Sequence, residues 1–326
     1  MAVHAPHPSD VLVTDLVNLY SSSTRRLEGI VAAGLRRGLT SARLGTPRQR
    51  AGDSTHAYRE RQLQQAHALL DQLHQQAGQV APIIIGRSYG AGLVAVDATV
   101  GPGRLTGRFG RVHTRAVEAI AANMTSSLQA NAERARVNVA TVFARAAAIE
   151  GALPASGRVA GVQFIGRRID DPYRRVALNA VGEGIVSLDT RRQVSAQLVR
   201  KLINEGVTDA VTGYVDRAGR RWPLDVYARM VARTTTREAM TAGTMNRLTE
   251  HGLDLVTISS HDHKADECTP YDGNTYSLSG NAAGYELLPE SPPFHAGCLH
   301  VLTPAAANLD AFEAELARAA AGPLDA

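Results

Sequence analysis

A helical periodicity over the first hundred residues is the feature that most restricts how this chain of 326 residues can fold. From about residue 8 to about residue 105, apolar side chains recur three or four positions apart, which places them on one face of an α-helix. The first such stripe consists of Val11, Leu12, Leu16, Leu19, Tyr20, Leu27, Ile30, Val31 and Leu35. Gly38 and the segment Thr46–Ser54 interrupt the pattern. The sequence therefore predicts a helical front half.

Further helices are predicted along the next hundred residues. The pattern favours one helix over 56–76 and another over 80–97, followed by a glycine-rich loop at 101–110. Residues 111–149 are either one long helix or two helices with a break near Asn131, and the sequence leaves both open. A linker is expected at 151–157, then short helices over 174–186 and 190–204, with Gly206 marking a helix end.

The last third of the sequence predicts short strands as well as helices. A β-hairpin is predicted at 210–224, with its turn at 216–219, and Pro223 opens a helix that runs to about His251. Gly252 closes that helix, short strands follow at 253–259 and 274–278, and a final helix is predicted at 308–319. We therefore expect a mainly α protein with a small C-terminal α+β module. Its divisions are a helical docking region (1–150), a helical connector (151–209) and the α+β module (210–326).

Composition excludes several protein classes. Apolar residues make up 44% of the chain and charged residues 20%, so a buried core is feasible. Two cysteines cannot form a disulfide framework, and the N-terminus lacks a secretory signal pattern. The most apolar window, 80–100, is interrupted by Arg87 and Asp97, which predicts a buried helix and no membrane partner. A net charge of +4, carried by scattered arginine pairs, is compatible with non-specific contact with nucleic acid.

Both cysteines and four of the eleven histidines lie in two short segments near the end of the chain, 261–273 and 291–304. Thiolate and imidazole groups are the ligands that zinc prefers, and Gly297 permits the turn that would bring several of them together. The candidate ligands of a structural zinc ion are Cys268, His295, Cys298 and His300, with His261 or His263 as substitutes.

Two alternatives to the zinc site stay open. In the first, the cysteines are small buried hydrophobic residues and the histidines hydrogen-bond the backbone. In the second, the segment His261-Asp262-His263 belongs to a metal-dependent nuclease, although Pro292-Pro293 stands where a ligand-bearing helix would be expected. We find no phosphate-binding glycine loop, nucleophile elbow or paired carboxylates, so no catalytic residue is assigned and no small-molecule substrate is expected.

Several segments together resemble one known family. They are Arg221-Trp222-Pro223-Leu224 and the helix that follows to Ala239, Gly252–His261, Tyr271–Gly280, and Pro292-Pro293-Phe294-His295 with Cys298, His300 and Thr303-Pro304. Over about residues 210–305 the chain resembles the minor capsid protein 2 family of tailed phages, which is related to the Mu F-like head morphogenesis proteins. Many relatives carry a second cysteine where this chain has Ala265, which weakens a four-ligand metal site.

The resemblance implies a structural function and no enzymatic activity. Such proteins are minor components of the phage head, associated with the portal or the head interior, and assist head assembly and in some phages DNA packaging or delivery. The implied partners are portal and major capsid proteins and packaged DNA, and the implied location is the virion, after assembly in the cytoplasm of a bacterial host. Arg229, Arg233 and Arg237 recur every four residues and are the candidate nucleic-acid contacts.

Overall fold

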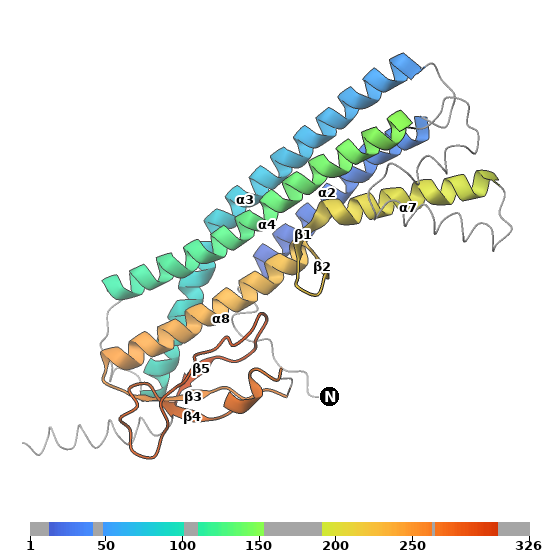
Figure 1. The fold of residues 1–326 in the computed structure, drawn as a ribbon. Coiled ribbons are helices and arrows are strands. Elements are labelled where there is room, and N and C mark those ends of the chain that lie inside the picture. The colour runs from blue at the N-terminus through green and yellow to red at the C-terminus, as the bar shows by residue number, and fades with distance from the viewer. Residues whose placement is uncertain (1–12, 42–47, 101–109, 153–190, 263–264, 306–326) are drawn as a thin grey trace, which may run out of the picture. The chain divides into compact units, whose positions relative to one another are not determined.

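The computed structural model describes residues 13–41, 48–100, 110–152, 191–262 and 265–305 (Figure 1). These ranges contain five α-helices and five short strands. The helices are α2 (Thr14–Ser41), α3 (Arg48–Val100), α4 (Arg111–Ala152), α7 (Arg191–Val211) and α8 (Leu224–Glu250). The predicted mainly α class with a small C-terminal α+β module is confirmed. The helices predicted at 174–186 and 308–319, and the ligand candidate His263, lie outside the described residues.

Helix α3 corrects two predictions at once. The sequence indicated separate helices at 56–76 and 80–97, but the structure has one helix of 53 residues from Arg48 to Val100. Gly78 and Pro82 lie inside it. Pro82 removes one backbone donor and disfavours a helix, but Ala81, Ile84 and Ile85 beside it are all buried. Burial of these side chains outweighs the local preference for a break.

Helix α4 settles the alternative that the sequence left open, because it runs without a break through Asn131. This asparagine is fully buried, and its Nδ2 donates a hydrogen bond of 3.1 Å to the Leu224 carbonyl. A polar residue inside a helix is tolerated when its side chain has such a tertiary partner. Asn131 therefore marks a packing contact and not a helix end.

Helix α7 extends beyond its predicted end, because Gly206 lies inside it and the helix continues to Val211. The predicted hairpin follows directly: β1 (Thr212–Val215) pairs antiparallel with β2 (Arg221–Pro223). Asp216 closes the turn, since its Oδ1 accepts hydrogen bonds from the backbone amides of Ala218 and Arg220. Helix α8 begins at Leu224, next to Pro223 as predicted.

Contacts within the chain divide it into two compact units. One comprises the residues up to Val17, Gln76–Leu128 and the residues from Ala228 on, and the other comprises Asn18–Gln75 and Gln129–Tyr227. In the second unit α2, α3 and α4 pack closely: a Cβ added to Gly34 would lie 2.7 Å from the Phe143 ring, and Arg59 donates to the Gly34 carbonyl. The first unit contains the histidine and cysteine segments.

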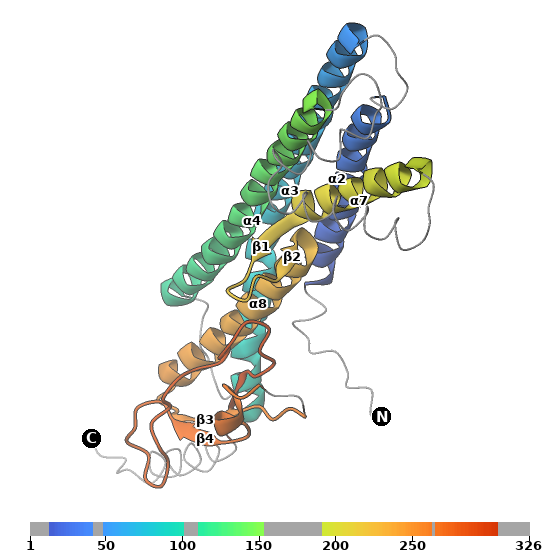
Figure 2. The same ribbon diagram turned by 45° about the vertical axis from the view of Figure 1, so that its right-hand side comes forward.

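A three-stranded sheet forms the base of the first unit (Figures 1 and 2). Its order is β4-β3-β5, and β3 (Leu255–Ile258) pairs antiparallel with both β4 (Thr275–Ser277) and β5 (Leu302–Pro304). The strands β3 and β4 were predicted, whereas β5 was missed because it is three residues long and ends in a proline. The sheet packs on the ends of α3 and α8 through one apolar cluster: Val96, Val100, Leu248, Leu253, Val256, Ile258, Tyr276 and Leu302.

Helices α3 and α8 meet at two glycines within the first unit. A Cβ atom on Gly92 would overlap the Met240 carbonyl oxygen, and one on Gly243 would overlap the Tyr89 carbonyl oxygen. Nearby, Arg247 of α8 forms two hydrogen bonds of 2.8 Å with the carboxylate of Asp97 on α3. The glycines allow close backbone approach, and the paired Arg–carboxylate contact fixes how the two helices are aligned.

One segment of α3 is more apolar than predicted. Within Thr55–Val100, an 18-residue window with a mean hydropathy of 1.3 is long and apolar enough to cross a membrane, and 39% of that window is buried. The core helix of a soluble protein passes the same test, so this is weak evidence for a membrane span. The absence of a membrane partner stays a prediction.

Candidate metal centre

Two loops bring the site together, and the first holds Cys268. This residue directly precedes the short 3₁₀ helix η1 (Thr269–Tyr271). The Ala265 carbonyl accepts hydrogen bonds from the Cys268 amide at 3.2 Å and from the Thr269 amide at 3.1 Å. The Cys268 thiol also donates to this carbonyl, at 3.3 Å. The turn directs the sulfur inward, where only 1% of the residue is exposed.

The second loop carries Cys298 and His300 and is anchored on helix α8. Gly297 has a φ of 78°, in the left-handed region that favours glycine, so the predicted turn at this residue is confirmed. Its amide donates a hydrogen bond of 3.1 Å to Thr234 Oγ1 on α8, and the Cys298 amide donates to the His295 carbonyl. The chain enters β5 soon after this turn, and His300 lies two residues before the strand. Its position is therefore anchored by the sheet.

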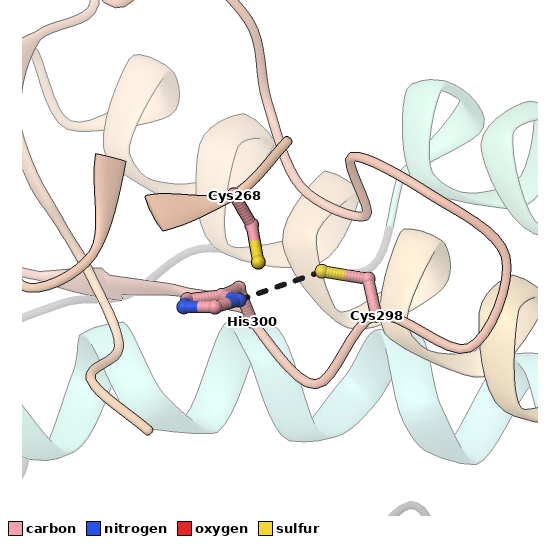
Figure 3. A group of neighbouring side chains, drawn as sticks. All are labelled: Cys268, Cys298 and His300. Atoms are coloured by element: carbon pink, nitrogen blue, oxygen red, sulfur yellow. Dashed lines mark hydrogen bonds between the residues drawn. The ribbon is translucent and has the colours of Figure 1, made fainter. Parts of the chain in front are cut away.

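Three potential ligand atoms converge at this point (Figure 3). The sulfurs of Cys268 and Cys298 and a ring nitrogen of His300 all lie within 4.8 Å of one another. The Cys298 Sγ is 3.5 Å from His300 Nδ1. All three residues are buried, at 1%, 0% and 1% exposure respectively, and both cysteines are free thiols. Burial raises the pKa of the Cys268 thiol, so the thiol form is favoured while the site holds no cation.

The other nitrogen of His300 has a partner that sequence reasoning missed. His300 Nε2 is 2.9 Å from Asp272 Oδ1, and the Asp272 side chain is only 7% exposed. The carboxylate also accepts hydrogen bonds from Ser260 Oγ and from the His261 amide, both at 3.0 Å. An ionised carboxylate is only an acceptor, so Nε2 carries the proton and donates it to Asp272. In the neutral ring, Nδ1 then presents its lone pair to the two sulfurs.

Aromatic rings cover the histidine side of the site. Tyr271 and Phe294 stack with their centroids 4.5 Å apart, and Phe294 meets the His300 ring edge-on at 6.1 Å. His261 lies across His300 at 5.0 Å, nearly perpendicular. This apolar cover limits the access of water and lowers the local dielectric around the three donors.

The structure thus brings together three of the four predicted ligands. His295 is not one of the converging donors: its Nδ1 is 3.1 Å from the Ala296 carbonyl, and its buried Nε2 has no hydrogen-bond partner in the described structure. His261 is near, but its Nε2 is 3.0 Å from Ser259 Oγ. Asp272 could not be selected beforehand, because nothing in its spacing links it to a histidine 28 positions later.

The predicted arginine row needs a correction. Arg229 and Arg233 are exposed on α8, whereas Arg237 is 1% exposed and its guanidinium donates to the Arg233 carbonyl. Each step of four residues turns a helix by about 40° beyond a full circle, so Arg237 lies roughly 80° around the axis from Arg229. This rotation carries Arg237 into the core, so the nucleic-acid contact remains a prediction only for Arg229 and Arg233.

Comparison with known proteins agrees with the sequence resemblance. A search of curated proteins and a search of solved structures both found no match. A family model described as phage minor capsid protein 2 matches residues 101–289, more than half of the chain. The match starts before α4 and includes Cys268 and Asp272, but it ends before Cys298 and His300. The chain belongs to the phage minor capsid protein 2 family.

Proposed function

We propose that this protein is a minor head component that docks at the portal vertex or on the inner face of the shell and assists head assembly. The family match over residues 101–289 carries this proposal, because it gives the chain a structural role in a phage head. In this proposal the protein joins the head during assembly in the cytoplasm of the bacterial host and remains in the virion.

The helices support a docking function. Helix α3 has 53 residues and α4 has 42, which correspond to roughly 80 Å and 60 Å at 1.5 Å per residue. Helices of that length present extended polar surfaces along which larger partner subunits can bind. The portal and the major capsid protein are the partners that we propose.

Packaged DNA is the second proposed contact. Arg229 and Arg233 are exposed one turn apart on α8, and the chain carries a net charge of +4. Contacts from such arginines to phosphates would be independent of base sequence and sensitive to salt. They suit a protein that must tolerate DNA moving past it.

The site geometry supports a structural role more than catalysis. All three converging donors are at most 1% exposed, so a nucleic-acid phosphodiester could not reach them without an opening of the loops. A nuclease needs an accessible metal-bound water to attack the phosphate. The donors come from two loops, which an ion bound here would hold together.

Co-purification tests the proposed docking. The tagged chain is expressed together with the portal protein and, separately, with the major capsid protein of the same phage. We expect at least one of these partners to be retained at physiological salt. Failure to retain either one, although all three proteins are soluble and folded, would contradict docking. In parallel, plasmid DNA is incubated with the chain and Mg²⁺, Mn²⁺ or Zn²⁺; nicking that disappears in His261→Ala would favour the nuclease alternative.

A further inference from the structure

We propose that Cys268, Cys298 and the Nδ1 atom of His300 bind one zinc ion, with Asp272 holding the His300 ring in the binding orientation. His295 is not part of this ligand set. This inference is independent of the proposed head function, because it concerns the isolated chain. It assigns the site a ligand class, a ligand set and a positioning residue.

The donor spacing fits zinc. Tetrahedral coordination with Zn–S of about 2.3 Å and Zn–N of about 2.0 Å places a sulfur and a nitrogen about 3.5 Å apart, and two sulfurs about 3.8 Å apart. The Cys298 Sγ to His300 Nδ1 distance is 3.5 Å, and no pair among the three donors exceeds 4.8 Å.

The hydrogen-bond geometry of His300 points the same way. Because Asp272 accepts the proton of Nε2 at 2.9 Å, the nitrogen that faces the sulfurs is the one able to donate a lone pair to a cation. Histidines that bind metals usually donate their other ring N–H to a carboxylate or a carbonyl, which fixes the ring and raises its basicity. Asp272 is itself held by Ser260 and by the His261 amide.

Charge also selects the cation. Two thiolates neutralise one divalent ion, so the complex of Zn²⁺ with both cysteines and a neutral imidazole has no net charge. The three donors are almost fully buried, and burying an unpaired cation among them would carry a large desolvation cost. A complex without net charge avoids most of that cost. Thiolates favour zinc over the hard ions Mg²⁺ and Ca²⁺, which prefer oxygen ligands. Binding displaces the two thiol protons to solvent.

The ion would add a direct link between two segments that already meet through the Asp272–His300 contact and the Tyr271–Phe294 stack. Cys268 belongs to the turn before η1, and Cys298 and His300 belong to the loop that leads into β5. The described segment between the cysteines, 269–297, contains the 3₁₀ helix η1 and the strand β4, and the ion would close it as a loop. Closing such a loop with a metal reduces the conformational entropy of the unfolded chain.

The first experiment uses the intact, full-length chain. The protein is purified without added metal, treated with a chelator, and titrated with Zn²⁺ and with Co²⁺. We expect about one ion per chain, and a Co²⁺ spectrum with near-ultraviolet thiolate charge-transfer bands and intense visible bands of a tetrahedral site. Folded protein that binds no zinc, or cobalt bands without thiolate character, would overturn the proposal.

Variants then test the ligand set. Cys298→Ser and His300→Ala should each lower zinc affinity by at least about 100-fold, whereas His295→Ala should bind zinc like the unmodified chain. If His295→Ala loses zinc as well, the three-donor set is wrong. If the ligand variants fail to fold, the unmodified chain is tested with a chromogenic disulfide that reacts with free thiols. We expect zinc to slow the reaction of both cysteines. Equal reaction rates with and without zinc would overturn the proposal.

Discussion

The Nε2 atom of His300 lies 2.9 Å from the Oδ1 atom of Asp272, and this contact fixes which nitrogen of the ring faces the two cysteines. The contact joins the residue directly after η1 to a residue two positions before β5, and the two are 28 positions apart in the sequence. The contact orients the His300 ring towards Cys268 and Cys298. The ring can neither flip nor exchange its tautomer without losing its hydrogen bond to the Asp272 carboxylate.

The first prediction concerns this contact. Asp272→Asn keeps the size of the side chain but removes its charge, so we expect zinc affinity to fall by about 10- to 100-fold while saturation still reaches about one ion per chain. Competition with a chromophoric chelator measures the affinity. Asp254→Asn is the matched control, since Asp254 bonds Ser277 and Ser279 on the β4 side and should leave affinity unchanged. Unaltered affinity in Asp272→Asn would show that the carboxylate does not position the ring.

The second prediction concerns the contact between α3 and α8. In Gly92→Ala the new methyl group would overlap the Met240 carbonyl, so we expect the free energy of unfolding to fall by about 1–3 kcal/mol or more. Gly90→Ala, two residues away on α3, meets nothing within 4 Å and should raise it by about 0.5–1 kcal/mol through helix propensity. Chemical denaturation of both variants provides the measurement. Equal effects of the two substitutions would contradict the close approach at Gly92.

The third prediction is a pH dependence. The amide of Arg220 is the main cause that lowers the pKa of Asp216 to about 2 from its usual 3.8, with further hydrogen bonds from the Arg220 and Trp222 side chains. Because the folded-state pKa is the lower one, the stabilisation is complete above about pH 4 and is lost as the pH falls towards 2.

Asp216→Asn tests this assignment. We expect a lower melting temperature than that of the unmodified chain at pH 6, with the difference shrinking as the pH approaches 2. Thermal unfolding followed by circular dichroism across pH 2–6 measures it, and Glu118→Gln, at an exposed position of α4, is the control. A difference that stays constant over this range would show that the Asp216 charge does not stabilise the hairpin turn.

The fourth prediction separates the three arginines of α8. The double variant Arg229→Ala/Arg233→Ala should bind duplex DNA more weakly, reduce the salt dependence of binding by about two phosphate contacts, and keep its stability. Arg237→Ala should instead destabilise the fold by about 2–4 kcal/mol, because it empties a buried position. Fluorescence anisotropy against salt and denaturant unfolding measure the two effects. Arg200→Ala/Arg217→Ala removes the same charge from other exposed positions; if it weakens binding equally, α8 is not the contact surface.

The fold could be predicted from the sequence wherever local pattern and packing agree. The first predicted stripe, in its described part from Leu16 on, and the strands β3 and β4 show this. The apolar residues that set these patterns in the sequence largely also form the core. Helix α3 shows the opposite: Gly78 and Pro82 oppose a helix locally, but buried neighbours decide the outcome. The position of Arg237 was also wrong, because a period of four residues is longer than a helical turn.

The candidate site was predictable in its donors but not in its geometry. The clustering of Cys268, Cys298 and His300 in two loops signals a shared site, because both cysteines of the chain and four of its eleven histidines lie in these two short segments. The separation of His295 from these donors depends on the turn at Gly297. The contribution of Asp272 depends on how the η1 turn meets the loop before β5, which is a tertiary relationship without a sequence period.

Mass spectrometry of purified heads, both immature particles and mature virions, tests the structural role most directly. The account predicts that peptides of this chain are recovered with the portal protein in at least one of the two particles, in far fewer copies than the major capsid protein. Heads of both kinds that contain portal and shell proteins but lack this chain, and that assemble normally when its gene is deleted, would contradict it.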